Sequence, residues 1–393
     1  MKTILKTLLT AVVLFAGAHY APAQDAETDL SVKKESRAAI RRGVEFLLEE
    51  QKENGSWLRN PAITGLACVA LHESNLAQEK PEVSAAVQKG RTFILQFVRD
   101  NGSIAPESGD YVNYTTSVCL SALAIIDERE DRSVMRAARH FLIDSQLDED
   151  HAKHPTKPGN SFYGGIGYGS RGPTRPDLNN TSYALEALYL TKNLDKETKY
   201  AKKSELAWDN AVKFLKEVQN IPEDAGQNWD VSDSKDDNMD GGFVYQPDAS
   251  KPTSKLRKQG KDVQDLLSYG SMTYAGLKSM IYADLEKDDY RVRAAIQWAR
   301  DNYDLSENPG MGPEGYYYFL QTFAKALDAY GQDTITTTDG KVHNWREDLL
   351  LKLIELQKAD GYWANDRHGR WMESIPELVT SYSLIAMEVA LSK

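Results

Sequence analysis

A short pattern recurs six times along the chain and constrains its fold more than any other feature. Each copy is an apolar segment of helical length in which a small residue precedes Leu or Met. The six pairs are Ala70-Leu71, Ala122-Leu123, Ala187-Leu188, Ser279-Met280, Ala326-Leu327 and Ala386-Met387. Six positions earlier stand Thr64, Thr116, Thr181, Thr273, Leu320 and Thr380. Because Thr is a weak helix-interior residue but caps free N–H groups in a first turn, the pattern predicts six helices that begin in the same way.

A second, amphipathic helix precedes each of these segments. Most copies have an aromatic residue five positions before a Gln or the residue that replaces it. The pairs are Phe46 with Gln51, Phe93 with Val98, Phe141 with Gln146, Phe214 with Gln219, and Trp298 with Tyr303, and Gln357 marks the sixth helix. These helices carry Lys, Arg and Glu, which predicts an outer position, whereas the apolar helices that follow them are expected to be buried on most sides.

Six outer–inner helix pairs predict an all-α fold, a single α/α six-barrel toroid over residues 38–393. Closure is favoured over an open helical array because the chain has no polar capping repeat and its first and last repeats carry the clearest motif copies. Strand signals are weak, and residues 334–340 are expected to form a short hairpin or a loop.

The N-terminus has the features of a secretion signal. Lys2 and Lys6 precede a short apolar run, and Ala21-Pro22-Ala23 fits a cleavage site. We therefore expect residues 1–23 to be a signal peptide and 24–37 a lead-in, with the protein exported to the periplasm or secreted. The run is too short to span a bilayer and no later segment is apolar for eighteen residues, so no integral membrane span is expected.

Composition excludes several classes of protein. The 393 residues include 47 Lys and Arg against 58 Asp and Glu, a formal net charge of −11, which disfavours nucleic-acid binding. Apolar residues make up 41% of the chain, an ordinary globular share. Cys68 and Cys119 are too few for a disulfide-dense scaffold, and both lie in apolar helical runs. We expect them to be core residues rather than a disulfide.

Two connections between outer and inner helices are unusually long, at about residues 147–178 and 220–267. Loops of this length in a compact domain are usually lids, binding loops or disordered insertions. In a toroid both would lie at the end where the inner helices begin, and the N-termini of those helices favour anionic or polar groups. The sequence does not establish the role of the 220–267 loop.

Two motifs resemble a known superfamily. Gln51 with Gly55-Ser56-Trp57, and Gln357 with Gly361-Tyr362-Trp363, are similar to the QW repeat of squalene–hopene cyclases, oxidosqualene cyclases and protein prenyltransferase β subunits. The segment from Gly164-Gly165 through Asp177-Leu178-Asn179-Asn180-Thr181 resembles the Asp-x-Asp-Asp-Thr motif of the cyclases. The resemblance to the terpenoid cyclase and prenyltransferase superfamily implies a single α/α barrel and a cyclase-like activity or its relic. Gln51, Trp57, Gln357 and Trp363 are expected to be structural, tying outer helices to neighbouring turns.

The chain departs from that superfamily at the residues that carry chemistry. In the cyclases the middle Asp is the general acid, and here that position is Asn179, followed by Asn180. An amide cannot release a proton, so only Asp177 of the motif retains a carboxyl, and Asp177 is equally well explained as a helix cap. The prenyltransferases hold zinc with Asp, Cys and His in later repeats, where this chain has no Cys. We therefore expect no metal and no cofactor, and catalysis stays open.

Aromatic residues near the starts of the inner helices are the other candidate site residues. Such rings line the cyclase cavity, and they would equally fill a core. The candidate ligand-binding residues are Tyr168, Tyr183, Tyr274, Tyr316, Tyr317 and Tyr318. Lining by Tyr suits an isoprenoid or another amphipathic small molecule.

Three functions stay open on these grounds: a cyclase-like enzyme with altered chemistry, a non-catalytic toroid that binds a hydrophobic ligand or a protein, and a carbohydrate-active α/α barrel. The third would need two carboxylates facing each other across a groove. The loop acids that could form such a pair are Asp110, Asp177, Asp240, Glu314, Asp360 and Asp366.

Overall fold

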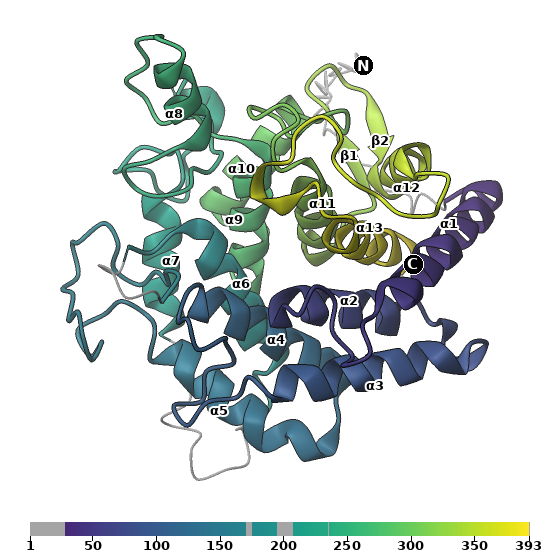
Figure 1. The fold of residues 1–393 in the computed structure, drawn as a ribbon. Coiled ribbons are helices and arrows are strands. Elements are labelled where there is room, and N and C mark those ends of the chain that lie inside the picture. The colour runs from purple at the N-terminus through teal and green to yellow at the C-terminus, as the bar shows by residue number, and fades with distance from the viewer. Residues whose placement is uncertain (1–27, 170–174, 195–206, 235, 393) are drawn as a thin grey trace, which may run out of the picture.

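The computed structural model describes residues 28–169, 175–194, 207–234 and 236–392, so the predicted signal peptide at 1–23 lies outside the described residues. The described part is mostly helical, with thirteen α-helices and one small hairpin (Figure 1). The outer helices are α1 (Leu30–Glu50), α3 (Pro81–Leu95), α5 (Arg132–Ile143), α7 (Trp208–Glu217), α10 (Tyr290–Asp301) and α12 (Trp345–Leu356). The inner helices are α2 (Pro61–Glu73), α4 (Val112–Ile126), α6 (Leu178–Leu190), α9 (Gly270–Tyr282), α11 (Tyr316–Tyr330) and α13 (Pro376–Leu391).

The remaining elements are short. The helix α8 (Lys251–Lys258) lies in the connection between α7 and α9. The antiparallel strands β1 (Thr334–Thr336) and β2 (Val342–Asn344) form the hairpin that was one of two expectations for this segment. The 3-10 turns are η1 (Leu76–Gln78), η2 (Arg129–Asp131), η3 (Val231–Asp233) and η4 (Arg370–Met372).

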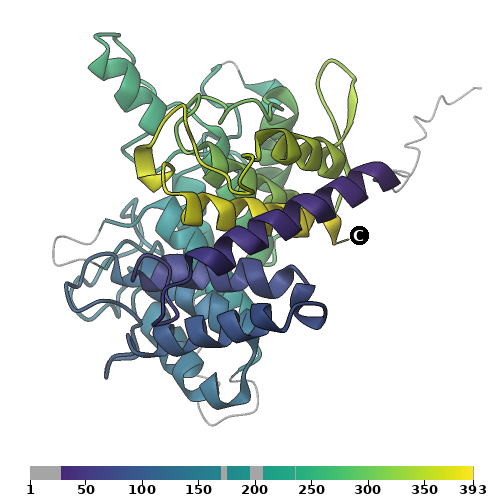
Figure 2. The ribbon, with the colours of Figure 1, turned by 45° about the vertical axis from the view of Figure 1, so that its right-hand side comes forward.

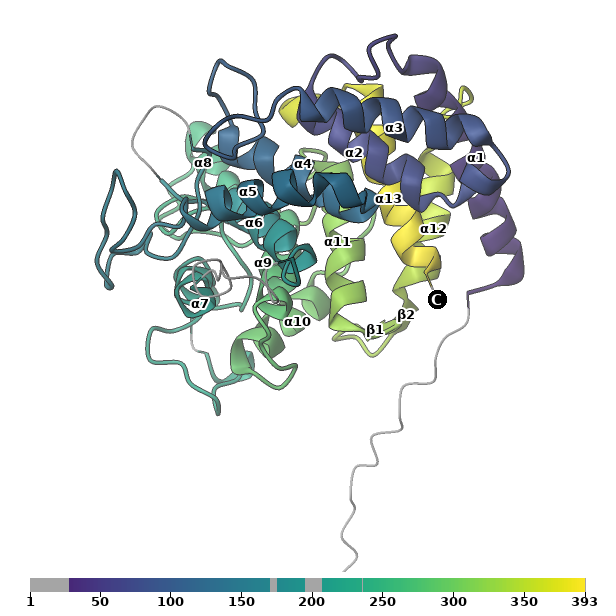
Figure 3. The same cartoon turned by 90° about the horizontal axis from the view of Figure 1, so that it is seen from below.

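The inner helices contact one another in chain order, from α2 through α4, α6, α9 and α11 to α13, and α13 also contacts α2. Figure 3 shows them grouped in the middle of the molecule with α1, α3, α7, α10 and α12 outside. The first helix α1 lies against α12 and α13, so the first and last described helices are neighbours (Figure 2). Apolar side chains of the inner helices face both the ring and the outer layer, which explains their burial over almost their whole length.

A glutamine at the end of four outer helices ties each repeat to the next. The side-chain amide nitrogens of Gln51, Gln146, Gln219 and Gln357 each donate two hydrogen bonds of 2.7–3.2 Å to backbone carbonyl groups. One acceptor is a glycine in the connection that follows the helix and the other belongs to the next outer repeat: Gly55 and Ala86, Gly164 and Ala207, Gly241 and Arg291, Gly361 and Ala39. The structural role expected for Gln51 and Gln357 is confirmed, and the bond to Ala39 joins the sixth repeat to the first.

The glycine of this turn is required by its conformation and by its neighbour. Gly361 has φ +87°, and a β-carbon there would lie 2.7 Å from the carbonyl oxygen of Arg42 on α1. Gly55 has φ +85°, and its β-carbon would lie 2.4 Å from the carbonyl oxygen of Lys89 on α3. Because only glycine adopts this φ without strain and leaves that space empty, the outer helices approach the turns closely.

The recurring threonine has a different partner from the one expected. Its hydroxyl accepts a hydrogen bond of 2.9–3.1 Å from a backbone N–H in the connection that leads into its helix, not from the first turn of the helix itself. The donor and acceptor pairs are Trp57 with Thr64, Ile104 with Thr116, Ile166 with Thr181, Phe243 with Thr273, and Trp363 with Thr380. The expectation of a helix cap was wrong, because a threonine buried in the helix can still reach a loop that folds back over it.

Both cysteines are free and buried, as expected for core residues. Desolvation raises the pKa of the Cys68 thiol to about 12. Among the described residues, no helix is long and apolar enough to cross a membrane.

We expect Thr64→Val to lower the free energy of unfolding by about 1–3 kcal/mol, because the buried N–H of Trp57 would lose its acceptor while the side-chain shape stays almost unchanged. Urea titration followed by circular dichroism measures this change. The matched control is Thr92→Val, at an exposed position of α3 where the hydroxyl bonds only to its own helix. Equal effects of the two substitutions would contradict the anchoring role.

Candidate functional site

The inner helices begin at the same end of the ring, and hydrogen bonds connect their first turns. The N–H groups of Asn113, Leu178 and Gly270 donate to the carbonyl groups of Tyr168, Tyr245 and Pro309 respectively. Each acceptor lies in the connection that leads into the next inner helix. The N–H of Tyr318 similarly donates to the carboxylate of Glu373, which lies before α13. We call this the N-terminal end of the ring, and it brings both long connections together.

Asp177 is a fully buried carboxyl group at this end. It is the N-cap of α6: one carboxylate oxygen accepts the N–H of Asn180 at 2.9 Å and the other accepts its side-chain amide at 2.7 Å. Burial raises the pKa of Asp177 to about 6, although these hydrogen bonds and the charge of Lys251 act in the opposite direction. The residue is therefore both a structural cap and a group that exchanges a proton near neutral pH.

The two amides of the motif lie beside this acid in different surroundings. Asn180 is buried, and its side-chain oxygen has no hydrogen-bond partner among the residues that the structure describes. Asn179 is half-buried in the first turn of α6. An unsatisfied acceptor thus lies beside a protonatable carboxyl, and both are buried.

Half-buried tyrosines surround Asp177. The hydroxyl groups of Tyr168 and Tyr245 lie 3.5 Å apart, and the ammonium group of Lys251 lies 3.6 Å from the centre of the Tyr245 ring. Tyr114 and Tyr318, also half-buried, project from the first turns of α4 and α11. These four tyrosines, Tyr114, Tyr168, Tyr245 and Tyr318, are called the tyrosine cluster below.

Aromatic side chains also lie along the central axis around which the inner helices are arranged. Tyr183 of α6 lies 5.1 Å from the ring of Tyr114 on α4 and 6.1 Å from that of Tyr318 on α11. Tyr318 in turn lies 6.1 Å from Tyr382 on α13. Because α6 and α11 are not neighbours in chain order, this contact crosses the ring, and aromatic side chains occupy its middle.

The other predicted ligand-binding tyrosines lie elsewhere. Tyr274 is buried between α9 and α11, where its ring packs 5.8 Å from Phe319 and 5.0 Å from Phe323. Tyr316 and Tyr317 are buried side by side, with their ring centroids 5.4 Å apart. The structure thus brings Tyr168, Tyr183 and Tyr318 together with Asp177, Asn179 and Asn180, and it places the remaining three in helix packing.

A register shared by the inner helices distinguishes the tyrosines near Asp177 from the tyrosines in helix packing. Tyr114 and Tyr318 stand two residues before the aligned Thr position, as does Asn179, whereas Tyr183 and Tyr382 stand two residues after it. Residues four apart lie on one face of a helix, so these positions face the axis together. Tyr274, Tyr316 and Tyr317 are out of this register. The sequence contains this signal, and it would have identified Tyr114 as a further candidate.

Further from the N-terminal end of the ring, charged side chains follow the tyrosines along the axis. Five residues after the Thr position stand Glu186, Lys278 and Lys325, and both ammonium groups lie 2.6 Å from the carboxylate of Glu186. Burial alone would raise the pKa of Glu186, but the two lysines lower it to about 2. On α11 the side-chain nitrogen of Gln321 is also buried without a partner among the described residues. The layer of the axis around Glu186 is therefore polar.

Cationic groups and a second buried acid complete the N-terminal end. Arg370 and Lys255 both bond to the carboxylate of Glu314, at 2.6 and 2.9 Å, which attaches α8 to the ring. Glu373 accepts the N–H of Tyr318 at 2.8 Å and a side-chain N–H of Asn365 at 2.7 Å, and burial raises its pKa to about 7. The sequence carries no signal for Arg370 and Glu373, which lie in an irregular connection, or for Lys251 and Lys255, which lie in the short helix α8 outside the six-pair pattern.

The loop acids do not form a recognisable catalytic pair. Asp240 is held by Ser268 and by the indole N–H of Trp298, and Asp366 pairs with Lys358. Asp110 and Asp360 are exposed and lie in turns at the surface. Within the described ranges, no group of three or more His, Cys, Asp or Glu residues is placed to hold a metal ion.

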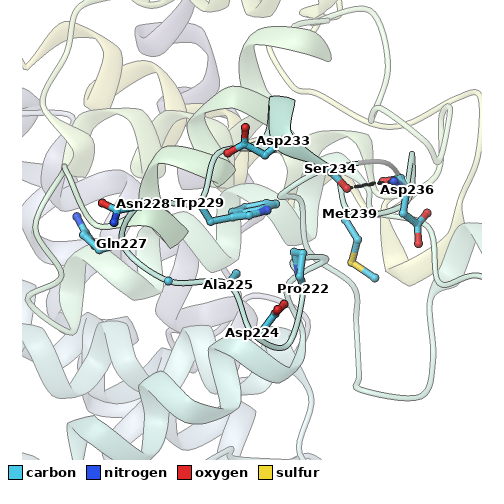
Figure 4. Close-up of a pocket in the computed structure, with 11 residues that line it drawn as sticks. Pro222, Asp224, Ala225, Gln227, Asn228, Trp229, Asp233, Ser234, Asp236 and Met239 are labelled. Atoms are coloured by element: carbon cyan, nitrogen blue, oxygen red, sulfur yellow. Dashed lines mark hydrogen bonds between the residues drawn. The ribbon is translucent and has the colours of Figure 1, made fainter.

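A separate open hollow of about 850 Å³ lies in the 220–267 connection (Figure 4). Trp229, Met239 and Pro222 line it together with Asp224, Asp233 and Asp236. The segment packs on the outer helix α10, since Arg293 donates to the carbonyl of Trp229 at 3.0 Å. The hollow shares no lining residue with the tyrosine cluster, and we take the N-terminal end of the ring as the candidate site.

No protein-family model matches the sequence. No curated protein sequence matches it either. Among solved structures, the fold is similar to an inactive variant of an α-1,6-mannanase from Salegentibacter in complex with α-1,6-mannotriose, with TM-score 0.54 and 11% identity over 91% of this chain and 100% of that one. It is also similar to a type II terpene cyclase from Scytonema, with TM-score 0.52 and 12% identity over 91% of this chain and 98% of that one. The chain therefore folds like α/α toroid proteins that include both kinds of enzyme.

The buried carboxyl of Asp177 should make stability depend on pH in a defined direction. Its pKa of about 6 lies above its ordinary value, so the folded chain holds the proton more tightly than the unfolded chain. This contribution to the free energy of unfolding is largest at low pH and falls by about 3 kcal/mol between pH 3 and pH 7. Chemical unfolding of wild type and Asp177→Asn across this range measures it. Parallel curves for the two proteins would contradict the raised pKa.

Proposed function

We propose that this protein is a closed α/α six-barrel, exported by its N-terminal segment, that binds an oligosaccharide at the N-terminal end of its ring. The tyrosine cluster around Asp177 carries this proposal. Tyr114, Tyr168, Tyr245 and Tyr318 are half-buried, so each leaves part of its side chain exposed. A pyranose ring has apolar C–H faces, which stack on aromatic rings, and a rim of hydroxyl groups, which form hydrogen bonds with polar groups.

The polar groups at this end match the hydrogen-bonding chemistry of a sugar. Near its pKa, the carboxyl group of Asp177 can donate or accept a hydrogen bond. The side-chain oxygen of Asn180 is a buried acceptor with no donor among the described residues. The hydroxyl groups of Tyr168 and Tyr245 can act in both ways. Because a buried polar group without a partner costs free energy, a ligand that supplies hydroxyl groups gains affinity here.

An isoprenoid-like hydrophobic ligand is the second candidate, supported by the likeness to the terpene cyclase fold. Cyclisation of a polyene needs a dry apolar cavity and a strong acid. Here the axis carries Glu186 with its two lysines, and Asn179 stands where the resemblance places the acid. A hydrocarbon chain would leave these polar groups without partners, so the oligosaccharide is favoured.

Hydrolysis of the sugar is not part of the proposal. Glycoside hydrolysis requires a second carboxyl group that faces the acid across the bond to be cleaved. The carboxylate of Glu373, a buried acid at this end, is occupied by an N–H group at the start of α11 and by Asn365. The carboxylate of Glu314, also buried here, is occupied by Lys255 and Arg370. We propose binding as the function, with Asp177 as a hydrogen-bonding group.

Isothermal titration of residues 24–393 with α-1,6-mannotriose, cellotriose and xylotriose, and with geranylgeraniol in cyclodextrin, tests the proposal. We expect at least one trisaccharide to bind, and Tyr318→Leu to weaken that binding by about tenfold because it removes one stacking ring and its hydroxyl. The control is Tyr189→Leu, a half-buried tyrosine at the opposite end of α6. Binding of geranylgeraniol alone would support the isoprenoid candidate, and binding of none of the four would overturn the proposal. Reducing-end assays on the same samples report any hydrolysis.

A further inference from the structure

Non-glycine residues with a left-handed backbone conformation lie at two kinds of position in this ring. Among the described residues, Asn75, Asp127 and Asp284 have positive φ just after the inner helices α2, α4 and α9. Asn and Asp tolerate this conformation, and it commonly ends a helix. The five other non-glycine residues with positive φ lie in connections at the N-terminal end: Leu58, Arg59, Tyr111, Trp371 and Met372.

The second group is unusual because its side chains are large. A β-carbon destabilises the left-handed conformation, and long apolar side chains have no local hydrogen bond to offset that cost. Trp371 has φ +56° and the next residue, Met372, has φ +66°. Folding alone would favour Gly or Asn at such positions.

The strained residues also expose apolar surface. The exposed fractions are 57% for Tyr111, 43% for Trp371 and 49% for Met372, and Leu58 is exposed as well. Burial therefore does not offset the strain. Neither the left-handed conformation of these residues nor the exposure of their apolar side chains stabilises the fold. A role in binding explains both features. We call Leu58, Tyr111, Trp371 and Met372 the rim.

Trp371 is held in place before any ligand arrives. Its indole packs on Gly315, where an added β-carbon would lie 3.0 Å from the ring. The guanidinium group of Arg370 lies 4.5 Å from the centre of the indole and is itself fixed by the carboxylate of Glu314. A rigid aromatic surface loses little entropy on binding, which favours recognition of another flat or ring-shaped surface.

The rim is continuous with the tyrosine cluster. The ring of Tyr111 packs edge-on at 5.1 Å against Tyr168. Trp371 lies two residues before Glu373, whose carboxylate accepts the N–H of Tyr318. A ligand seated on the cluster thus meets the rim on two sides.

We propose that the rim binds further sugar units of the same ligand, so that the protein recognises a glycan chain rather than a single short oligosaccharide. The inference rests on the proposed function and extends it. One sugar unit lies on the tyrosine cluster, and a later unit stacks on the indole of Trp371. Affinity then depends on the length of the glycan chain, and Trp371 is the residue that determines this dependence.

The test compares the trisaccharides above with α-1,6-mannohexaose, cellohexaose and xylohexaose in the same titration. We expect the hexasaccharide of the bound series to bind about tenfold more tightly than its trisaccharide, the gain expected from one additional stacked ring. Trp371→Asn should remove that gain, and Trp371→Tyr should keep most of it. Leu190→Asn, at an exposed apolar residue at the far end of α6, is the matched control.

Thermal unfolding separates a binding role from a structural one. Asn and Gly adopt the left-handed conformation more readily than Trp, so Trp371→Asn and Trp371→Gly should not lower the melting temperature. A clear drop in both variants would show that Trp371 serves the fold and would overturn the inference. Equal affinity for tri- and hexasaccharide, or an unchanged gain in Trp371→Asn, would also overturn it while the proposed function stands. Failure of every saccharide to bind would overturn the proposed function itself.

Discussion

The architecture depends on one interaction, the side-chain amide of a glutamine shared between two neighbouring repeats. In four repeats the same nitrogen donates to a carbonyl in the connection that follows its helix and to a carbonyl in the next outer repeat, and Gln357 extends this link back to Ala39 in the first repeat. A donor with two buried acceptors is costly to disrupt, because both carbonyl groups would lose their partner. The glycine beside it, as at Gly361, lets the helices approach closely enough for the bond to form.

This link leaves the N-terminal end of the ring free to vary. The threonine hydroxyl fixes where a connection returns to its inner helix, so the connection can be ten residues long, as between α1 and α2, or more than fifty, as between α7 and α9. The fifth repeat, which has Leu320 in place of Thr, uses another anchor. There Asn308 accepts the N–H of Ser271 and donates to the carbonyl of Glu314. The altered loop presents the carboxylate of Glu314 to Arg370 and Lys255.

The axis of the ring sets the chemistry of the candidate site. Aromatic rings occupy its first layer and an ion cluster its second, and both come from the same helical face of the inner helices. Glu186 keeps its charge because two ammonium groups lie within hydrogen-bond distance, whereas Asp177 has no such partner and becomes neutral near pH 6. A ring lined in this way favours ligands that combine flat apolar faces with hydroxyl groups.

The sequence by itself determined the repeating architecture, because helix periodicity, the Gln and Gly of each turn and the aligned Thr are local signals. It also placed both cysteines in the core and located Asp177 and Asn180 at one helix start. Only the tertiary structure decided which tyrosines meet. Tyr183 and Tyr318 touch across the ring, whereas Tyr274 and Tyr317 lie in helix packing, because the rotation of each helix about its own axis is set by its neighbours. The partners of Lys251, Arg370 and Glu373 likewise follow from where irregular connections cross, which depends on contacts between residues far apart in the chain.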